Sequence, residues 1–275
     1  MTTSSHPNLS GVEIRRRCRC GEWTGPTAGC AMGYVQANLV MVPKTVAGDF
    51  RRFCELNPKP CPVLEVTEPD SFEARTAAPG SDLRTDLPRY RVLREGICTE
   101  KPTRVESICE EASASGDPLV AFLLGCSFTF EAAMLDAALP VRHIAEHKNV
   151  PMYRTNLACH AAGPFAGPLV VSMRPMTPQQ AERAETVTAR TPLAHGGPIH
   201  IGDPSAIGIA QINAPDYGDA VTIGDHEVPV FWACGVTPME ALMRAKIDVS
   251  ITHEPGHMFV TDLPDGELSQ MRSYR

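Results

Sequence analysis

The chain has 275 residues, enough for one large domain or two smaller ones, and its composition is that of an ordinary globular protein. Its formal net charge of −7 argues against a nucleic-acid-binding protein, and its longest basic run is Arg15-Arg16-Arg17. No apolar stretch approaches the roughly 20 residues that cross a bilayer, and the polar start MTTSSHPNLS lacks a signal-peptide core. We therefore expect a soluble, cytoplasmic protein without nucleic-acid or membrane partners; the sequence leaves a homo-oligomer open.

The ten cysteines are scattered through apolar segments and form no C-x-x-C pair. In a chain of this length without an export signal, this distribution predicts reduced, mostly buried thiols. Cys18 and Cys20 form the one close pair, but their spacing matches no common zinc template. We interpret them as structural.

The N-terminal third predicts a strand, a helix and a second strand. The continuous apolar run YVQANLVMVP (34–43) predicts a buried strand. The segment TVAGDFRRFCELN (45–57) predicts an amphipathic helix, because its apolar residues share one face before Asn57-Pro58 stops it. The segment CPVLEVTE (61–68) predicts the next strand.

Two later segments, PLVAFLLGCSFTFEAAMLDAAL (118–139) and VPVFWACGVTPMEALMRAK (228–246), resemble each other. Each runs from an apolar strand through a Gly/Cys turn into a helix. Thr237 and Glu240 form a capping box with Pro at the first helical position, and Ser127 or Thr129 is expected to cap the other helix. The segment KIDVSITHEPGH (246–257) predicts a third strand.

Continuous apolar strands suit a sheet that is covered on both faces, as in parallel sheets. We therefore predict the α/β class, with a mainly parallel sheet core and helices on both faces. The intervening segment is rich in turns, with a strand at 169–175 and a helix at 178–190. It predicts a second, smaller α/β domain inserted into the first. The expected domains are a core α/β domain of residues 1–139 plus 223–275 and an inserted α+β domain of residues 140–222.

Three turns in these segments carry polar residues. In open parallel sheets, ligands bind at the C-terminal ends of the strands, where helix N-termini favour anions. The turns GCSFT, CGVTP and THEPGH would then converge on one crevice. The alternative is that the Gly/Cys turns only pack helices on strands.

Residues 253–257 read HEPGH, a literal match to the H-E-x-x-H of zinc peptidases. That motif requires a helix, which brings both imidazoles onto one face to bind the metal. Pro255 and Gly256 are poorly suited to a helix interior, with costs of roughly 3 and 1 kcal/mol relative to Ala. We therefore interpret the pentapeptide as a turn and expect no metal.

No phosphate-binding G-x-x-x-x-G-K-[ST], no G-x-G-x-x-G after a strand and no G-x-S-x-G elbow is present, so ATP, dinucleotide and serine-hydrolase functions lose their usual support. Charged and imidazole groups instead gather in turn-rich stretches, which are usual sites of function. Cys126, just before a helix N-terminus, would suit a nucleophile, although a small buried residue is the alternative. Arg154 and Arg174 could bind a carboxylate or form internal ion pairs.

The sequence leaves several roles open for the histidines. His200, His253 and His257 could act as general acids or bases near neutral pH. They could also gather as ligands for a metal, and any one of them could be a structural histidine. Because two of them lie on one tight turn, we favour a functional role for the group.

Ten blocks along the chain together resemble the D-glutamate cyclase-like family, also called hydro-lyases. The resemblance spans roughly residues 11–263, and the blocks read, in order, GPTAGCAMGYVQANLV, FCELNPKPCPVLEVTEP, DLRTDLPRYRV, GCSFTFEAAM, NVPMYRTN, GPLVVSMRP, HGGPIHIGDPSAIGI, PDYGD, VPVFWACGVTP and ITHEPGHMFVTDL. The resemblance implies a two-domain α/β lyase of amino-acid metabolism. The chain departs from the pattern at Glu254, where a small residue is expected, and at Met239, where Gln is expected.

The resemblance also implies a reaction and a set of site residues. The implied reaction is loss of water from a small amino- or hydroxy-carboxylate, with cyclisation of D-glutamate to 5-oxo-D-proline as the reaction named for the family. The family pattern covers these candidate residues: Cys126, Ser127, Thr129, Arg154, Asn156, Arg174, His200, Asp203, Thr237, His253 and His257.

Cyclisation of glutamate needs a base for the ammonium, donors for an oxyanion and a clamp on the α-carboxylate. We expect proton transfer by His253 and His257, or by His200 with Asp203. The clamp would be Arg154 or Arg174, with Asn156 and Thr129 also contacting substrate. We expect Cys126, Ser127 and Thr237 to lie near the oxyanion; no metal or organic cofactor is required. A non-catalytic carboxylate- or metal-binding protein of the same fold is the alternative.

Overall fold

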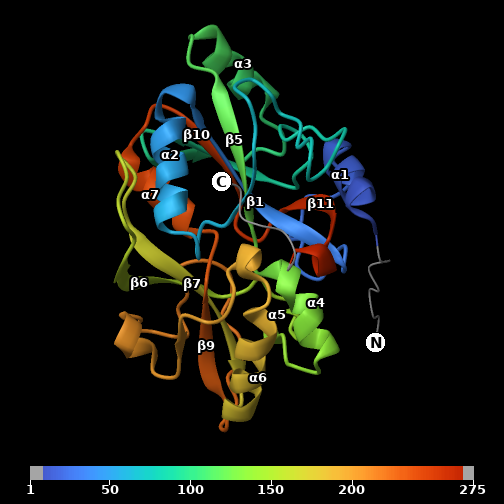
Figure 1. Ribbon diagram of the computed structural model, residues 1–275, viewed down its shortest axis with the longest axis vertical. Helices are drawn as coiled ribbons and strands as arrows, with labels where there is room; N and C mark the ends of the chain where they lie inside the picture. The colour runs from blue at the N-terminus through green and yellow to red at the C-terminus, as the bar shows by residue number, and fades with distance from the viewer. Residues whose placement is uncertain (1–8, 269–275) are drawn as a thin grey trace.

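Two sheets, one above the other, form the framework of the protein, whose structure is a computed structural model that describes residues 9–268 (Figure 1). The strands are β1 (Tyr34–Pro43), β2 (Val63–Val66), β3 (Tyr90–Arg94), β4 (Ile97–Glu100), β5 (Leu119–Gly125), β6 (Met152–Ala158), β7 (Pro168–Met176), β8 (His200–Ile201), β9 (Val228–Ala233), β10 (Ser250–His253) and β11 (Phe259–Pro264). The α-helices are α1 (Gly11–Arg19), α2 (Lys44–Leu56), α3 (Glu106–Ala114), α4 (Phe128–Asp136), α5 (Arg142–Ala145), α6 (Pro178–Thr188) and α7 (Thr237–Ala245). Short 3₁₀ helices are η1 (Pro192–Ala194), η2 (Pro204–Ile207) and η3 (Asp265–Glu267).

The larger sheet has seven strands in the order β2-β5-β1-β10-β3-β4, with β11 also paired to β1. The smaller sheet has four strands in the order β6-β7-β9-β8. All of these pairs of neighbouring strands are antiparallel. The prediction of a mainly parallel sheet core is therefore wrong, and the fold is a mixed α/β arrangement of antiparallel sheets.

The error has a physical cause in β5 and β9. Every residue of β5 is buried, because helices and loops cover both faces of this antiparallel sheet. A continuous apolar run predicts that both faces of a strand are buried, but it does not predict whether the strand is parallel or antiparallel to its neighbours. In addition, β5 and β9 belong to different sheets, so the two similar strand–turn–helix segments cannot be neighbours in one parallel sheet.

The smaller sheet combines strands from two parts of the chain. Its strands β6, β7 and β8 lie within the segment 140–222 that we expect to be an inserted domain, whereas β9 comes from the following segment. The division into residues 1–139 plus 223–275 and residues 140–222 stays a prediction.

The two helices that follow β5 and β9 bridge the two sheets. Helix α4 follows β5 and packs against β1 of the larger sheet and against α6, whereas α7 follows β9, packs against β7 of the smaller sheet and shares an apolar cluster with α2 (Figure 1). The turns 125–129 and 234–237 lead into these helices and are called the crossing turns. They pack at the junction of the two sheets, where Cys126 and Cys234 share one buried cluster with Met258.

Each crossing turn is tied by a threonine to a neighbouring strand. The Thr129 hydroxyl accepts a hydrogen bond from the backbone N–H of Gln36 at 3.1 Å, and the Thr237 hydroxyl accepts one from that of Val170 at 3.0 Å. Neither Ser127 nor Val236, the N-cap residues of α4 and α7, makes a side-chain capping bond. The predicted caps are wrong because tertiary partners engage these hydroxyls.

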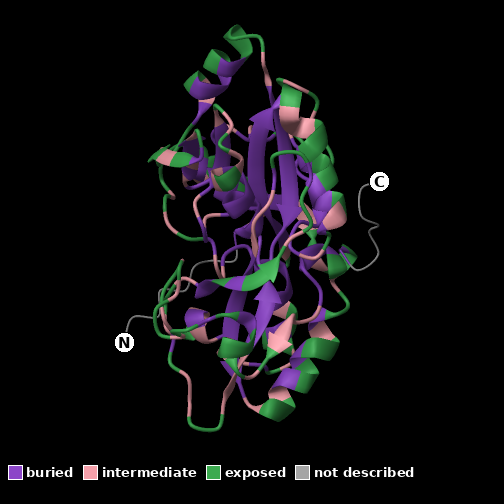
Figure 2. Ribbon diagram, turned by 90° about the vertical axis from the view of Figure 1, so that its left-hand side faces the viewer, coloured by how far each residue is buried: buried purple, intermediate pink, exposed green. Residues whose placement is uncertain are grey.

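The strands form the buried centre and the helices present their outer faces to solvent (Figure 2). All of β1 after Tyr34 is buried, as its apolar sequence predicts. In α2, Phe50, Phe53 and Cys54 are the buried face, which confirms the predicted amphipathic helix. All ten cysteines are free and most are buried, as predicted. Among the described helices, none is long and apolar enough to span a membrane.

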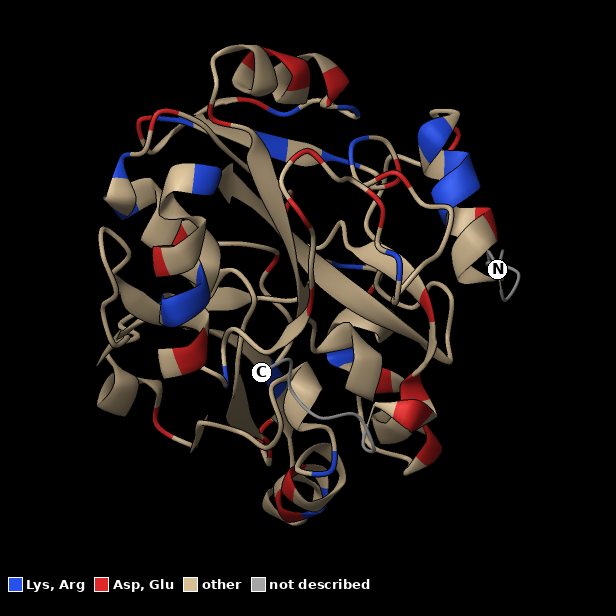
Figure 3. Ribbon diagram, turned by 45° about the horizontal axis from the view of Figure 1, so that its top comes forward, with Lys and Arg blue, Asp and Glu red and all other residues tan. Residues whose placement is uncertain are grey.

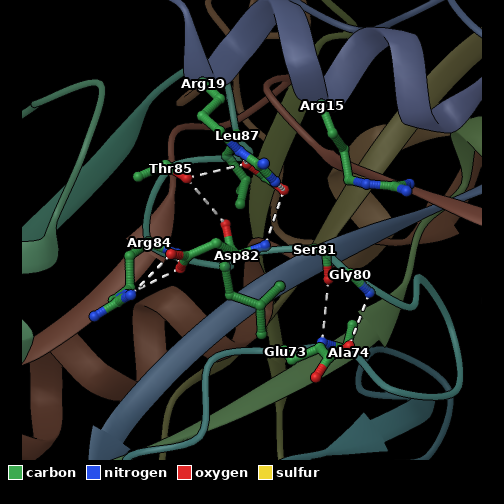
Figure 4. A network of polar contacts seen from close by, with 12 residues as sticks. Arg15, Arg19, Glu73, Ala74, Gly80, Ser81, Asp82, Arg84, Thr85 and Leu87 are labelled. Atoms are coloured by element: carbon green, nitrogen blue, oxygen red, sulfur yellow. Dashed lines mark hydrogen bonds and ion pairs between the residues drawn. The ribbon is translucent and has the colours of Figure 1, made fainter.

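The block DLRTDL forms a polar network that fixes the loop before β3 (Figure 4). The fully buried carboxylate of Asp86 accepts two hydrogen bonds from Arg19 of α1, at 2.7 and 2.6 Å, and one from Thr85 at 3.0 Å. Asp82 holds Arg84 in the same way at 2.9 and 2.8 Å. Arg19, one of the basic residues of α1 (Figure 3), thus ties this helix to the loop that precedes β3.

Candidate active site

The predicted site residues are found in three places. Arg154 lies in a polar network at the junction of the sheets, and His253 and His257 flank Glu254, another member of that network. Cys126, Ser127 and Arg174 lie in a buried cluster behind the first crossing turn. His200, Asp203 and Asn156 lie on the smaller sheet near η2, and Thr129 and Thr237 hold the crossing turns as described above.

The HEPGH pentapeptide is a turn between β10 and β11. Strand β10 ends at His253, and Gly256 has a φ of +84°, a left-handed conformation that favours glycine. The Gly256 carbonyl accepts a hydrogen bond from the N–H of Thr27 at 2.8 Å, and the Pro255 carbonyl accepts one from the Asn149 amide at 3.2 Å. The turn confirms the sequence interpretation and removes the helix that a zinc peptidase would need.

The two histidines of this turn are held as neutral rings. His253 Nδ1 lies 3.3 Å from the Leu39 carbonyl, and His257 Nδ1 lies 3.1 Å from the Pro255 carbonyl. A carbonyl only accepts, so each Nδ1 carries the proton and each neutral ring keeps a lone pair on Nε2. Burial lowers the pKa of His253 to about 4 and that of His257 below its ordinary value. His257 is only half-buried, so its free nitrogen is suited to take a proton from a ligand.

Glu254, between the two histidines, holds Arg91 of β3. Its carboxylate accepts hydrogen bonds from Arg91 at 2.5 and 2.9 Å and from Lys101 at 3.2 Å. Arg91 Nη1 also lies 3.7 Å from Met239 Sδ. The two positions where the chain departs from the family pattern, Glu254 and Met239, therefore both contact Arg91.

Arg154 of β6 forms the other half of the network. Its guanidinium donates to Glu240 at 2.7 Å, to Asp216 at 2.6 Å and to the Tyr217 hydroxyl at 2.7 Å. The Tyr217 hydroxyl in turn donates to the same Glu240 oxygen. The Tyr217 ring lies 5.0 Å from the Arg154 guanidinium and 5.8 Å from that of Arg91. This tyrosine therefore joins the two arginines.

The network pairs positive and negative side chains at close range. For Glu254, burial alone would raise the pKa, but hydrogen bonds and charge from Arg91 and Lys101 outweigh it and hold the pKa below its usual value. Beside Arg154 and Asp216 lies a cavity of ≈ 270 Å³, also lined by Tyr153, residues 208–211 and Ala214. The Arg154–Asp216 end of the network thus has room for a small molecule.

The buried cluster is built around Arg174 of β7, which is fully buried. Arg174 donates to Glu131 of α4 at 3.2 Å through Nε and again through Nη2, and to Ser127 and Ser172 at 3.1 Å each. His143 Nε2 lies 3.1 Å from the same Glu131 oxygen. Because these protein groups occupy its guanidinium, Arg174 resembles an internal tie between the sheets more than a substrate clamp.

Cys126 lies beside this cluster and is buried. Burial raises the pKa of its thiol, so the sulfur stays protonated at neutral pH. Its Sγ accepts a hydrogen bond from the N–H of Phe128 at 3.5 Å. This environment is that of a packed thiol and gives no support to a nucleophile.

His200 and Asp203 make local contacts. His200 Nε2 lies 2.7 Å from the backbone carbonyl of Asp203, and its ring stacks on Phe231. The Asp203 carboxylate accepts from the N–H and hydroxyl of Ser205 at 2.9 and 2.7 Å, as the cap of η2. The imidazole and the carboxylate therefore do not form a side-chain pair.

The sequence analysis missed Arg91, Tyr217 and Glu240. Arg91 and Tyr217 fall inside the blocks DLRTDLPRYRV and PDYGD, but a tyrosine between Asp and Gly looks like an ordinary turn residue. Glu240 looks like a capping-box residue. Within residues 9–268, no group of three His, Cys, Asp or Glu side chains is arranged to hold a metal ion.

We expect the protein to lose stability as the pH falls from about 6.5 to about 4. Buried His195 and His253 each have a pKa lowered from 6.5 to about 4. Between these values the unfolded chain binds protons that the folded chain excludes, so stability is present above pH 6.5 and lost below it. Each group contributes on the order of 3 kcal/mol.

Urea unfolding between pH 4.5 and 7 measures this effect. A His195→Gln variant should show a shallower pH dependence of stability, because glutamine does not titrate. Its amide can still donate to the Lys59 carbonyl that His195 Nδ1 contacts at 2.8 Å. Replacing the exposed His226 with Gln is the control and should leave the slope unchanged. An identical slope in wild type and His195→Gln would contradict the prediction.

Comparison with known proteins identifies the family of this chain. The sequence profile described as D-glutamate cyclase matches residues 120–262, about half of the chain. The chain belongs to this family.

Curated relatives match over nearly the full length. A "putative hydro-lyase" of Geobacillus kaustophilus is 56% identical over 94% of this chain and 97% of its own. Proteins of the same name are 53% identical in Stutzerimonas stutzeri, over 98% of this chain and 99% of the relative, and 56% identical in Rubrobacter xylanophilus, over 93% and 96%. These relatives support a lyase of the hydro-lyase family.

Proposed function

We propose that this hydro-lyase family member removes water from a small amino- or hydroxy-carboxylate, and that its reaction is the cyclisation of D-glutamate to 5-oxo-D-proline. The observation that carries the proposal is the pair of guanidiniums on Tyr217, next to a turn with two neutral histidines. Arginines bind carboxylates with paired hydrogen bonds, and a neutral imidazole can take a proton from an ammonium.

The arginines are already paired with protein carboxylates, which a substrate would replace. The Arg154–Asp216 pair is at the surface, where its side chains are 40% and 32% exposed. Exposed pairs contribute only about 0 to 1 kcal/mol, so exchange for a substrate carboxylate costs little. The Arg91–Glu254 pair is less exposed and is held by Lys101 as well. We therefore assign the exchangeable clamp to Arg154 and a fixed positive charge to Arg91.

The test is to incubate the purified protein with D-glutamate, L-glutamate and a panel of hydroxy acids and to look for products lighter by the mass of water. We expect turnover of D-glutamate and a loss of about 100-fold in kcat/KM in Arg154→Ala, because a charged hydrogen-bonding partner is removed. Arg52→Ala is the matched control, since Arg52 makes an exposed pair within α2.

Two outcomes would contradict the proposal. One is wild-type protein that releases water from none of these acids. The other is Arg154→Ala with full activity. Thermal stabilisation by the acids without any turnover would instead favour a non-catalytic carboxylate-binding protein.

A further inference from the structure

Tyr217 occupies the centre of the network, yet its sequence context marks it only as a turn residue. Its hydroxyl accepts a hydrogen bond from Arg154 Nη2 at 2.7 Å and donates one to Glu240. Its ring contacts both Arg91 and Arg154. The residue as a whole is half-buried.

The surroundings keep this hydroxyl protonated. Burial and the carboxylate of Glu240 raise the pKa of Tyr217 well above its ordinary value. The hydroxyl is therefore a hydrogen-bond donor at any neutral pH. A phenolic O–H reorients by rotation about a single bond, so it can turn from Glu240 to another acceptor without moving the ring.

Glu240 is suited to receive another donor in exchange. It lies in the first turn of α7, is only 4% exposed, and accepts a hydrogen bond from Arg154 Nε at 2.7 Å that does not depend on Tyr217. A buried carboxylate needs charged or polar donors. A substrate ammonium supplies such a donor and would release the Tyr217 O–H toward the reacting carboxyl group.

We propose that Tyr217 is a catalytic residue that donates a hydrogen bond to the oxyanion formed during cyclisation, and that Glu240 binds the substrate ammonium. This inference rests on the proposed function. The nitrogen lone pair forms the new C–N bond with the γ-carboxyl carbon while the C=O π pair moves to oxygen, where the Tyr217 O–H stabilises it. The pair on this oxyanion then re-forms C=O as the bond from carbon to the other γ-oxygen breaks. His257 carries protons from nitrogen to the departing oxygen. Two protons leave nitrogen and two arrive on that oxygen, so glutamate gives 5-oxoproline and water.

A pair of tyrosine variants tests the assignment. Tyr217→Phe keeps the ring against both arginines and removes only the hydroxyl. We expect kcat for D-glutamate to fall about 100-fold, as for loss of one oxyanion donor, with KM within about threefold of wild type. Tyr34→Phe is the matched control, because Tyr34 begins β1 and packs against the apolar cluster of Leu9, Ile14 and Cys18, outside the network. It should keep wild-type kcat.

Glu240→Gln tests the proposal that Glu240 binds the substrate ammonium. It should raise KM for D-glutamate while thermal stabilisation by glutarate, which has both carboxylates but no amine, stays as in wild type. A Tyr217→Phe variant that keeps more than a third of wild-type kcat, or raises KM alone, would overturn the role of Tyr217. In that case the proposed function stands, since wild-type turnover has been measured in the same assay. Absence of wild-type turnover would overturn both.

Discussion

Replacement of Arg174 with methionine is expected to lower the free energy of unfolding by about 3 to 5 kcal/mol. Arg174 is fully buried and Glu131 is 1% exposed, so the variant leaves a carboxylate buried without its guanidinium partner. Desolvation raises the pKa of Glu131, but His143 and Arg174 outweigh it and keep the carboxyl ionised. Two further hydrogen bonds, to Ser127 and Ser172, are lost as well.

Urea unfolding at pH 7 measures this loss, and the chain offers a matched control. Arg94→Met removes a guanidinium from an exposed pair with Glu111, whose side chains are 40% and 64% exposed. It should change stability by less than about 1 kcal/mol. The double variant Arg174→Met, Glu131→Leu should recover much of the stability, since no charge then remains unpaired. A loss below about 1 kcal/mol in Arg174→Met would contradict the prediction that this pair ties α4 to β7.

Replacement of His257 with glutamine is expected to lower kcat for the proposed reaction by about 10² to 10⁴-fold. Gln can still donate to the Pro255 carbonyl but cannot take up a proton. Because burial lowers the pKa of His257, the wild-type base stays neutral below the ordinary histidine pKa. Activity should therefore persist as the pH falls below about 6.5 and be lost only through the lowered pKa.

Steady-state kinetics between pH 4.5 and 8 check both parts of this prediction. Replacing His226, an exposed histidine in the turn before β9, with Gln should leave kcat and the pH profile unchanged. Wild-type activity that disappears already above pH 6.5, or His257→Gln with unchanged kcat, would rule out this histidine as the base.

Local patterns in the sequence predicted the elements well. The strand expected at 34–43 is β1 with the same bounds, and the helix expected at 45–57 is α2 within one residue at each end. The helix expected at 178–190 is α6, and it begins with a capping box of Thr177 and Gln180. These features depend on side-chain periodicity and on Pro and Gly, which act within a few residues along the chain.

Such local patterns do not predict which side chains meet when they are far apart in the chain. The site network joins Arg91 to Glu254 and Arg154 to Glu240, pairs that are 163 and 86 residues apart in the chain. Nothing local distinguishes an arginine that meets a distant carboxylate from one that faces solvent. The same holds for Thr129 and Thr237, whose hydroxyls suit a cap equally well but bind strands of the sheets.

By itself the sequence determined the family, through blocks spread over nearly the whole chain, and it determined that HEPGH is a turn, because Pro255 and Gly256 cannot sustain a helix. Only the tertiary structure decided that the sheets are antiparallel, that Arg174 is an internal tie and that Tyr217 joins two arginines. The reason is that strand direction and side-chain partners depend on the free energy of packing the whole chain, whereas turns and helix ends depend on the residues that form them.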